Sequence, residues 1–239
     1  VGRNDNSTLF TGTLTASADN RLALTNIGSG TLTLRPSVAS TYTGTTTVQG
    51  GTLELDFANS GALTSLLGAS ALSLASGDFT LRGRAGLAAV QTLGNLTINQ
   101  SGGKVSVLAG DATLTTLRLG TLSFGSASNS GTLLVSAPAN TQVTLSASTG
   151  LANGILGAGR AVFTDGTNFD WLTTTTASTP FVLSGLAAGS YTGLPSGGPG
   201  LATANYNLTA TQTQSAATLV GTLKITPSAA TQSLILGAN

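Results

Sequence analysis

One stretch decides the fold: Thr41-Tyr42-Thr43-Gly44-Thr45-Thr46-Thr47-Val48-Gln49-Gly50-Gly51-Thr52-Leu53-Glu54-Leu55. Residues 45–48 are all β-branched, which suits a pleated strand and penalises a helix through restricted side-chain rotation. Gly50-Gly51 can supply the positive φ of a sharp corner. Residues 52–55 then alternate polar and apolar side chains, which predicts that Leu53 and Leu55 share one face of a second strand.

Composition limits the classes of protein to which the chain can belong. Of 239 residues only 7% are charged and 5% aromatic, 32 are Gly, and His, Cys and Met are absent. Because 40% are hydrophobic, we expect an ordered aliphatic core under a surface of Ser, Thr and Asn. Without Cys there are neither disulfides nor thiol chemistry. A net charge of +1 predicts no nucleic-acid partner and no attraction to an anionic membrane.

The beginning of the chain does not resemble a signal peptide. Residues 1–6 read Val-Gly-Arg-Asn-Asp-Asn, without an apolar middle and without an initiating Met. No run of apolar residues is long enough to span a membrane as a helix. We therefore interpret the sequence as a processed chain or as an excerpt of a longer protein.

A short phrase recurs along the chain. Gly-Thr-Leu begins at Gly12, Gly30, Gly51, Gly120, Gly131 and Gly221. The first three copies follow one another at a spacing near twenty. A unit of about 20 residues cannot bury its own apolar face, so this repeat predicts a solenoid whose coils share one core.

Short segments between the glycines alternate apolar and polar residues, as strands with one buried face do. They are residues 22–24, 32–34, 72–74, 79–81, 96–98, 105–107, 117–119, 122–124, 143–145, 223–225 and 234–236. The residues expected to face inward are Leu32, Leu34, Val48, Leu53, Leu55, Leu72, Leu74, Leu96 and Ile98, and those expected to face outward are Thr31, Thr33, Thr47 and Thr52. Residues 60–77 and 85–94 are rich in Leu and Ala, but Ser, Thr and Gly interrupt them, so we expect strands and corners rather than helices.

A β-sandwich or barrel is the alternative fold. Sandwich hairpins favour Asn-Gly or Asp-Gly turns, and Asp165-Gly166 is the single Asp-Gly pair in the sequence. Hairpin signals are therefore scarce. We predict an all-β parallel β-helix, a β-solenoid with coils of roughly 20 residues.

Three segments carry a resemblance to a known family. Residues 4–14, 22–34 and 41–55 resemble the autotransporter-associated β-strand repeat, also called the passenger-associated transport repeat. The residues of this motif in the closest stretch are Thr41, Tyr42, Gly44, Val48, Gly51, Leu53 and Leu55. Thr45 departs from the pattern, since Gly often stands there. A second block, in residues 153–171 and 205–209, is similar to the downstream part of large secreted proteins with this repeat.

The resemblance implies a right-handed parallel β-helix, exported to or beyond the outer surface of a Gram-negative bacterium, usually without chemistry of its own. We expect residues 1–239 to form one continuous solenoid segment. Residues 184–200 contain Pro195, Pro199 and six glycines, which predicts an excursion from the stacked ladder. Loops on rigid scaffolds often hold binding residues, so this excursion is a candidate partner site, with a plain surface loop as the alternative.

Candidate catalytic and metal-binding groups are few. A coil of about 20 residues would bring Asp56 near Asp78, with Arg82 beyond, as in polysaccharide-active β-helix enzymes; solvated charges at strand ends are the alternative. Residues 165–170 hold spaced oxygen ligands but lack the spacing of known calcium loops. Without His or Cys, only Lys104 and Lys224 could activate a serine. We expect no catalytic residue, no metal and no cofactor.

Aromatic residues are mostly isolated, as core residues or corner packing would be. Phe169, Trp171 and Phe181 are the exception, and such a cluster is the kind of surface that binds carbohydrate.

The function predicted from these observations is structural: a rigid stalk, fibre or filament segment of a secreted or cell-surface β-solenoid. An adhesin that binds glycan or a host surface through loops is the first alternative, and a polysaccharide-active enzyme is the second. Neither terminus reads as a cap, so we also expect residues 234–239 to contact residues 1–14 of a tandem copy or second subunit, end to end. The residues of that contact would be Val1, Gly2, Leu234, Leu236 and Asn239.

Overall fold

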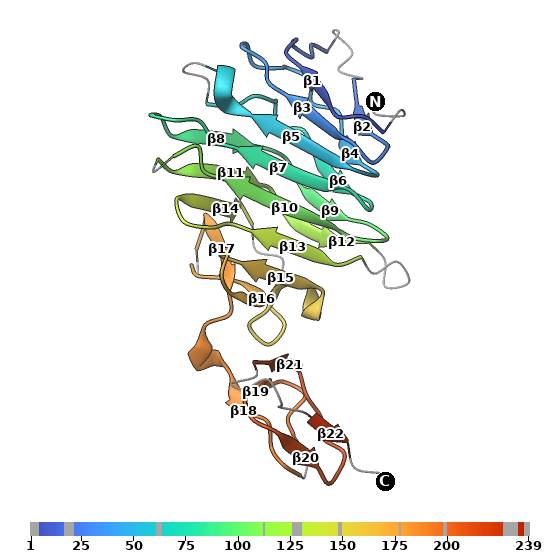
Figure 1. Cartoon of the computed structure of the whole chain (residues 1–239), viewed down its shortest axis with the longest axis vertical. Helices are drawn as coiled ribbons and strands as arrows, with labels where there is room; N and C mark the ends of the chain where they lie inside the picture. Colours follow the sequence, from blue (N-terminus) through green and yellow to red (C-terminus); the bar gives the residue numbers. More distant parts are fainter. Residues whose placement is uncertain are drawn as a thin grey trace.

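The computed structural model describes residues 5–16, 22–60, 64–111, 113–125, 131–147, 150–176, 178–197, 200–226 and 234–236. Over these residues the chain is all-β, with helical structure limited to three short 3₁₀ turns: η1 (Phe57–Asn59), η2 (Leu156–Gly159) and η3 (Ala188–Ser190). Figure 1 shows an elongated molecule in which successive strands stack along the long axis. The predicted β-solenoid is confirmed.

The first side of the solenoid is a long parallel ladder. Its strands are β1 (Thr8–Phe10), β3 (Thr31–Leu34), β5 (Thr52–Asp56), β7 (Asp78–Arg82), β10 (Gly103–Leu108), β13 (Leu133–Ser136) and β15 (Ala161–Thr164). Each strand pairs in parallel with the corresponding strand of the next coil. Parallel strands need long crossover connections, and here the other two sides of each coil provide them.

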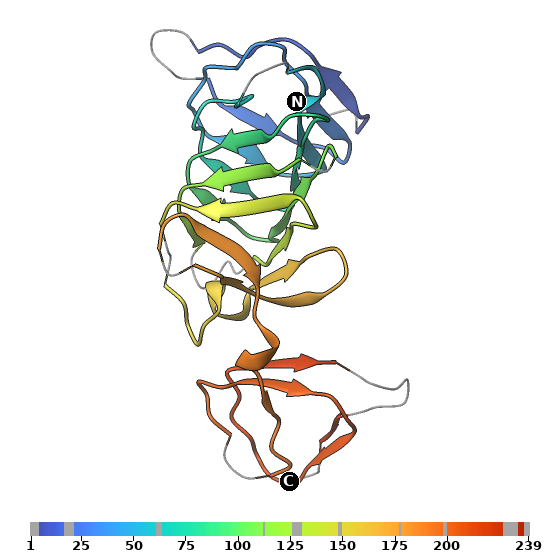
Figure 2. The same ribbon diagram turned by 90° about the vertical axis from the view of Figure 1, so that its left-hand side faces the viewer.

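The second and third sides are shorter ladders. The second side consists of β2 (Leu24–Asn26), β4 (Thr46–Val48), β6 (Leu72–Leu74), β9 (Leu96–Ile98) and β12 (Leu122–Phe124), and the third of β8 (Ala89–Thr92), β11 (Thr115–Leu119) and β14 (Thr141–Leu145). Figure 2 shows the third side face on. Before β8 this side continues without regular strands: the amide of Ser40 donates to Leu66 O at 2.8 Å, and that of Thr41 to Leu14 O at 3.0 Å.

The predicted coil length is wrong. The observed coil has about 26 residues instead of the roughly 20 expected, and both lengths are within the range of solenoid repeats. On the first side, Leu53 pairs with Phe79, and Phe79 pairs with Val105. Asp78 and Lys104 lie on the same two strands as Phe79 and Val105. They are joined by a hydrogen bond and are 26 residues apart. Thr33 and Glu54, which pair between β3 and β5, are only 21 residues apart, so this coil is one of the short ones.

The recurring Gly-Thr-Leu phrase gave the wrong period because its copies lie on different sides. Gly30 and Gly51 precede strands of the first side, whereas Gly120 precedes β12 on the second side. Gly12 follows β1 instead of preceding it. Only the distance from Gly30 to Gly51 measures a complete turn, and that coil is one of the short ones. Distances that involve Gly12 or Gly120 do not.

The core lies between the three sides and is almost entirely aliphatic. All nine residues predicted to face inward are buried, and Val48, Leu53 and Leu55 are completely so. The four Thr predicted to face outward are partly exposed. Burial of each large aliphatic side chain contributes roughly 1.5–3 kcal/mol, and stacking of equivalent residues joins these contributions into one cluster.

Two glycines of the motif are required by the stacking of corners. Gly51 has a φ of 54°, and a Cβ there would overlap the carbonyl oxygen of Gly30 in the preceding coil. Gly44 meets Leu22 O in the same way. A side chain at either corner would push successive coils apart.

An antiparallel hairpin closes the C-terminal end of the parallel stack. β16 (Phe169–Thr174) pairs antiparallel with β15, and β17 (Phe181–Gly185) pairs antiparallel with both β16 and β14. The pair thus bridges the first and third sides. Asp165-Gly166, the isolated hairpin signal of the sequence, lies in the turn between β15 and β16. This closure lies inside the chain and not at a terminus.

The remaining described strands form two small parallel sheets beyond the hairpin (Figure 1). They are β18 (Thr192–Gly193), β19 (Asn205–Leu208) and β21 (Thr222–Ile225) in one, and β20 (Gln212–Gln214) and β22 (Leu234–Leu236) in the other. Residues 184–200 lead from β17 to these sheets, and part of the expected excursion is β18. The assignment of residues 1–239 to one continuous segment stays a prediction. Among the described residues, no helix has the length and apolarity to cross a bilayer.

We predict that Leu53→Asp prevents folding, because an unpaired charge in this core costs several kcal/mol and a domain has only about 5–15 kcal/mol of stability. Leu53→Ala should lower the free energy of unfolding by about 2–5 kcal/mol. Thr47→Ser, at a partly exposed position, is the control and should be nearly silent. Urea denaturation followed by circular dichroism measures all three, and a parent-like Leu53→Asp would refute the inward assignment.

Candidate functional site

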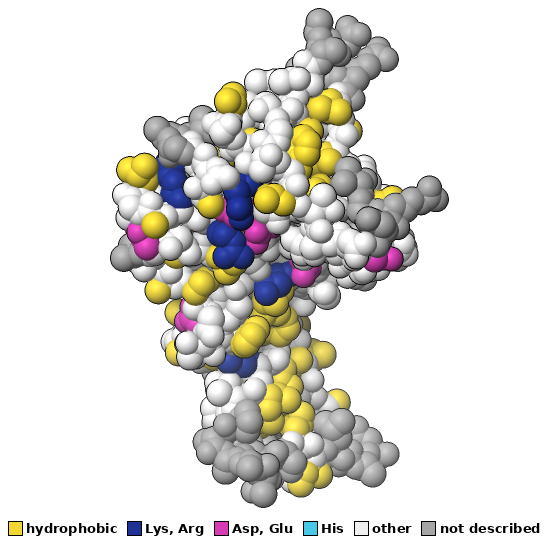
Figure 3. All heavy atoms as spheres, turned by 45° about the horizontal axis from the view of Figure 1, so that its top comes forward, with side chains coloured by type: hydrophobic (Ala, Val, Ile, Leu, Met, Phe, Trp, Pro, Cys, Tyr) yellow, Lys and Arg dark blue, Asp and Glu magenta, His cyan; other side chains and the backbone are white. Residues whose placement is uncertain are grey.

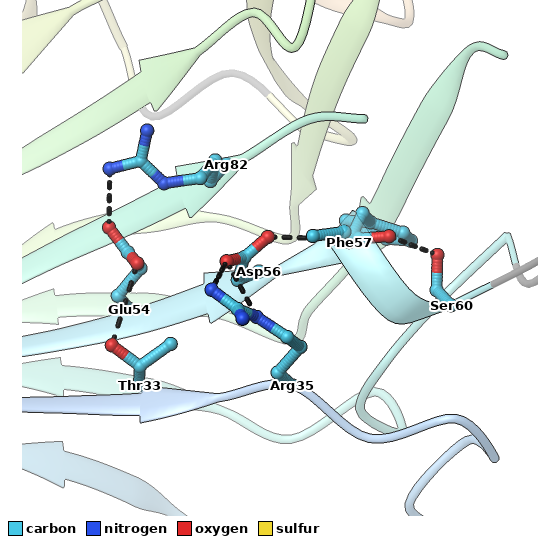
Figure 4. A network of polar contacts seen from close by, with 8 residues as sticks. Thr33, Arg35, Glu54, Asp56, Phe57, Ser60 and Arg82 are labelled. Carbon is cyan, nitrogen blue, oxygen red and sulfur yellow. Dashed lines mark hydrogen bonds and ion pairs between the residues drawn. The ribbon is translucent and has the colours of Figure 1, made fainter. Parts of the chain in front are cut away.

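A network of charged side chains crosses successive strands of the first side (Figure 4). Asp56, at the end of β5, has a side chain that is only 1% exposed. Its Oδ2 accepts hydrogen bonds from Arg35 Nε at 2.9 Å and Nη2 at 2.5 Å, and its Oδ1 accepts one from the amide of Ala58 at 2.8 Å. Asp56 therefore joins two coils and caps η1 at the same time.

A second pair lies beside the first. Glu54 Oε2 accepts a hydrogen bond from Arg82 Nη2 at 3.0 Å, and Glu54 Oε1 lies 3.5 Å from Thr33 Oγ1. The hydrogen bond to Glu54 is the main cause of the raised pKa of the Arg82 guanidinium. Because the Arg82 side chain is 45% exposed, this pair contributes little to stability.

A hollow of about 560 Å³ opens next to this network, lined in part by Asp56, Arg82 and Arg84. Arg84 is buried: its Nη1 donates to Ser60 Oγ at 2.7 Å, and its guanidinium lies 5.6 Å from the ring centre of Phe57. The charged groups that line the hollow are thus already engaged within the protein. Their arrangement fixes the corner after β5 against the next coil.

The predicted proximity of Asp56 and Asp78 is wrong. In the observed register Asp56 pairs with Arg82, whereas Asp78 pairs with Thr52 at the other end of β7. Four residues of strand separate these positions, or roughly 13 Å. Asp78 instead accepts a hydrogen bond from the amide of Lys104 at 3.0 Å. The structure brings Asp56 and Arg82 to adjacent strands, but Asp56 is paired with Arg35 and the carboxylate beside Arg82 is Glu54, with which Arg82 is paired.

The residues considered as a calcium loop form the turn of the β15–β16 hairpin. Asp165 Oδ1 accepts hydrogen bonds from the amides of Thr167 at 2.8 Å and Asn168 at 2.7 Å. These bonds, with the amide of Asn168 first, lower the pKa of Asp165 to about 2. The Asp170 carboxylate is not part of this turn and bonds instead to Tyr191 and Lys224. Within the described ranges, no group of three or more acidic side chains is arranged to hold a metal ion.

The aromatic cluster is only partly assembled. Phe169, 60% exposed, and Trp171 line a hollow of about 140 Å³ together with Val162, Asp170 and Lys224. Phe181 lies elsewhere, since it pairs with Leu145 on the third side and packs against the core.

Asp170 links the hairpin to the C-terminal sheets. Its Oδ1 accepts hydrogen bonds from Tyr191 Oη at 2.8 Å and Lys224 Nζ at 2.7 Å. Lys224 Nζ also lies 5.4 Å from the centre of the Tyr191 ring. Burial, together with the Asp170 carboxylate, raises the pKa of Tyr191.

The motif residue Tyr42 belongs to a buried polar chain. Its hydroxyl lies 2.8 Å from Thr46 Oγ1, which lies 2.7 Å from Ser70 Oγ. Ser70 Oγ in turn donates to Gly44 O at 2.6 Å. Burial raises the pKa of the Tyr42 hydroxyl. Tyr42 and Gly44 thus belong to one hydrogen-bonded corner. The amide of Thr41 donates to Leu14 O in the stack of coils.

Sequence reasoning missed two buried amides. Asn26 is 1% exposed and donates through Nδ2 to Gly50 O at 3.0 Å. Gln91 Oε1 accepts from the amides of Leu66 and Leu67, at 2.8 and 3.2 Å. Asn26 lies two residues after Leu24 and therefore faces the same, inward side, which could have revealed it. The strand expected over residues 22–24, however, ends before Asn26.

The residues predicted to make an end-to-end contact lie far apart in the chain and are only partly described. Leu234 and Leu236 belong to β22, which pairs with β20. Val1, Gly2 and Asn239 lie outside the described residues. Strands β1 and β22 are at opposite ends of the molecule (Figure 1).

One part of this β-solenoid matches a repeat named for autotransporter passengers. Residues 24–55 match the passenger-associated-transport-repeat family, so the repeat recognised in the sequence is confirmed. They contain β2 to β5, the second-side and first-side strands of two successive coils, with the glycine corners between them. No solved structure matches the chain.

A curated relative points the same way. The chain is 36% identical over 83 residues to the BmaC autotransporter adhesin of Brucella suis biovar 1 (strain 1330). The aligned part is 34% of this chain and 2% of that protein. The similarity is thus to a small piece of a much longer adhesin.

We predict that Asp56→Ala destabilises the fold. Loss of the carboxylate leaves the Arg35 guanidinium and the Ala58 amide without their partner, which should cost about 1–3 kcal/mol. Asp78→Ala, which removes a bond to one amide at a half-buried site, is the matched control and should cost less. Urea midpoints compare the two, and equal losses would contradict the assigned role of Asp56.

We also predict an acid-sensitive hairpin turn. Because folding lowers the pKa of Asp165 from its ordinary value of 3.8 to about 2, its contribution to stability is present above the unfolded value and is lost as pH falls toward the folded one. The difference in melting temperature between the parent and Asp165→Ala should therefore shrink from about pH 5 to about pH 2. A constant difference would exclude this role for the carboxylate, and Thr47→Ser serves as a pH-independent control.

Proposed function

We propose that this chain is a non-enzymatic structural segment of an exported β-solenoid, acting as a rigid stalk on or beyond the outer surface of a Gram-negative bacterium. The observation that carries the proposal is the parallel register maintained from β1 to β15 around one aliphatic core. The passenger-type repeat and the similarity to an autotransporter adhesin support it.

The geometry suits a stalk for a mechanical reason. Strands spaced about 4.8 Å apart place the seven strands of the first side over roughly 29 Å of length. Backbone hydrogen bonds run along this axis, so extension must break many of them together. Trypsin also has few targets, since the chain has nine Lys and Arg residues and Arg35, Arg82 and Lys224 are in ion pairs.

Two finer features belong to this proposal. We infer a right-handed winding, because parallel strands of one sheet are almost always connected in that hand. End-to-end contact with a tandem copy or second subunit is also part of it. The placement of β1 and β22 at opposite ends supports that arrangement (Figure 1).

An adhesive role is the second candidate, supported by the name of the similar Brucella protein. The expected binding loop, residues 184–200, connects β17 to the C-terminal sheets. Its deletion would therefore disturb the junction as well as any loop contact. The exposed side chain of Phe169 in β16 offers a site that can be changed without removing backbone.

The stalk is tested by displaying one copy or two tandem copies on a Gram-negative cell, with an epitope at the N-terminal end. We expect immunogold labelling to move farther from the cell surface with two copies, and native coils to resist trypsin while Leu53→Asp is digested. An unchanged label distance would contradict a rigid stalk. Depolymerisation of a polysaccharide by the parent, lost in an Asp56→Asn variant that circular dichroism shows to be folded, would overturn the non-enzymatic part.

A further inference from the structure

We propose that the boundary between the β16–β17 hairpin and the C-terminal sheets is a hinge, which a latch of polar side chains holds closed. The hinge segment is residues 187–190, and the latch is Asp170, Tyr191 and Lys224. The proposal concerns where the elongated molecule bends. It goes beyond the stalk function and does not depend on it.

The hydrogen-bonded ladder does not cross this boundary. β17, the last strand of the large sheet in chain order, pairs with β14 and β16, whereas β18 pairs with β19 in a separate sheet. In the described part of the chain, no strand pair joins the two sheets. Figures 1 and 2 both show a single stretch of chain that passes from one to the other. Bending at this point therefore breaks no strand pairing.

The apolar core does not cross the boundary either. The main cluster of buried side chains ends with Leu183 in β17. Tyr206 and Leu208 in β19 are also buried, but they are not members of that cluster. Figure 3 shows the molecule narrowing toward its C-terminal part, with hydrophobic side chains exposed along the narrow region. Two units without a common core move relative to each other unless a large hydrophobic interface joins them.

Packing at the boundary is incomplete. A hollow of about 140 Å³, with an almost wholly apolar surface, lies where Phe169 and Trp171 of β16 approach Lys224 of β21. The indole N–H of Trp171 is buried without a hydrogen-bond partner, and so is the side-chain carbonyl of Asn207, which is opposite Lys224 in the C-terminal sheet. Buried polar groups without partners are costly, and opening would let water reach them. Hydration of these groups lowers the cost of opening.

The latch holds the closed form through one carboxylate. Asp170 Oδ1 accepts hydrogen bonds from Lys224 Nζ at 2.7 Å and from Tyr191 Oη at 2.8 Å. Asp170 lies before the hinge segment, and both of its partners lie after it. The side chains of Lys224 and Asp170 are only 24% and 17% exposed, so removing either one leaves the other charge partly desolvated and unpaired.

A second contact fixes the orientation of the C-terminal sheets. Asn153, in the loop before η2, donates through Nδ2 to Ala202 O at 3.2 Å, and its carbonyl oxygen accepts from Asn205 Nδ2 at 2.8 Å. The Asn205 side chain is itself held in place, because its Oδ1 accepts a hydrogen bond from Thr222 Oγ1 at 2.8 Å. With contacts at Asp170 and at Asn153, rotation about the hinge segment must break hydrogen bonds between side chains and their partners.

The hinge segment has the properties that such a rotation needs. Residues 187–190 are Ala-Ala-Gly-Ser, and all four are exposed. Nothing lies within 4 Å of the position that a Cβ of Gly189 would take, so no neighbour restrains this residue. The preceding residue is fixed, because the amide of Leu186 donates to Trp171 O at 2.8 Å. Hinges are commonly a few such residues between well-anchored neighbours, where changes in φ and ψ are absorbed.

The hinge has a mechanical consequence for an elongated molecule. The solenoid and the latch are in series, so tension along the long axis acts on both equally. Separating two coils breaks many backbone hydrogen bonds together, whereas opening the latch breaks bonds of side chains. The latch therefore opens first, and the C-terminal sheets change direction while the solenoid stays folded.

Single-molecule energy transfer tests the hinge in the full chain. Because the chain has no Cys, dyes attach only at two introduced ones, Gln142→Cys in β14 and Thr213→Cys in β20. We expect a major closed form and a minor open form with a different transfer efficiency. Asp170→Ala and Lys224→Met should each raise the population of the open form by about tenfold.

Glu54→Gln is the matched control for the latch variants. It removes the carboxylate that pairs with Arg82, which is an ion pair of the same kind within the solenoid. The distribution of transfer efficiencies should stay as in the parent, because no contact across the hinge is changed.

Hydrogen exchange separates opening of the hinge from unfolding of the C-terminal sheets. In Asp170→Ala the amides paired between β19 and β21 should keep the protection that they have in the parent. Loss of that protection would overturn the proposal, since the sheets would then unfold instead of turning as a unit. The same distribution of transfer efficiencies in the parent, Asp170→Ala and Lys224→Met would also overturn it. Neither result bears on the stalk, which is tested by label distance and protease resistance.

Discussion

The structure depends on the hydrogen-bonded register between successive coils. Once Leu53 is opposite Leu32 and Phe79, every inward residue of a coil stacks on an inward residue of the next. A slip of one residue would turn the apolar set outward and the outward Thr set inward. The glycine corners serve this register, since a side chain at Gly51 would collide with the preceding coil. Uniform stacking is also why so few charges and aromatics suffice to hold the fold.

Polar groups inside the solenoid obey the same constraint. The Tyr42 chain of hydroxyls, Asn26 and Gln91 each satisfy main-chain or hydroxyl groups at corners, where the ladder is interrupted. The pair of Arg35 and Asp56 does so between coils. Buried polar groups without partners are costly, so irregular corners need side chains that replace the missing backbone bonds. These charges are therefore explained by structure before any chemistry is invoked.

The regular ladder ends where the chain reverses direction in β16 and β17. There the pairing becomes antiparallel, the first and third sides are joined, and side chains on the outer face no longer have an equivalent in a following coil. Phe169 and Trp171 occupy this position, and Asp170 connects it to the C-terminal sheets. In a repetitive molecule, the place where repetition stops is where side chains are free to contact something else.

Alternation and glycine spacing, read from the sequence, determined that the chain is an all-β solenoid. Alternation also determined that Leu32, Val48 and Leu53 face the core, because period-two patterns report burial directly. They also identified the repeat in residues 41–55. The coil length was decided only by the tertiary structure, because the copies of Gly-Thr-Leu lie on two sides of the coil and the pair that spans a full turn, Gly30 and Gly51, belongs to a short coil. For the same reason the partner of Asp56 is Arg35 in one coil and not Asp78 in the next. The hairpin cap and the pairing of Asp170 with Lys224, 54 residues apart, likewise depend on how distant segments meet, which no local pattern records.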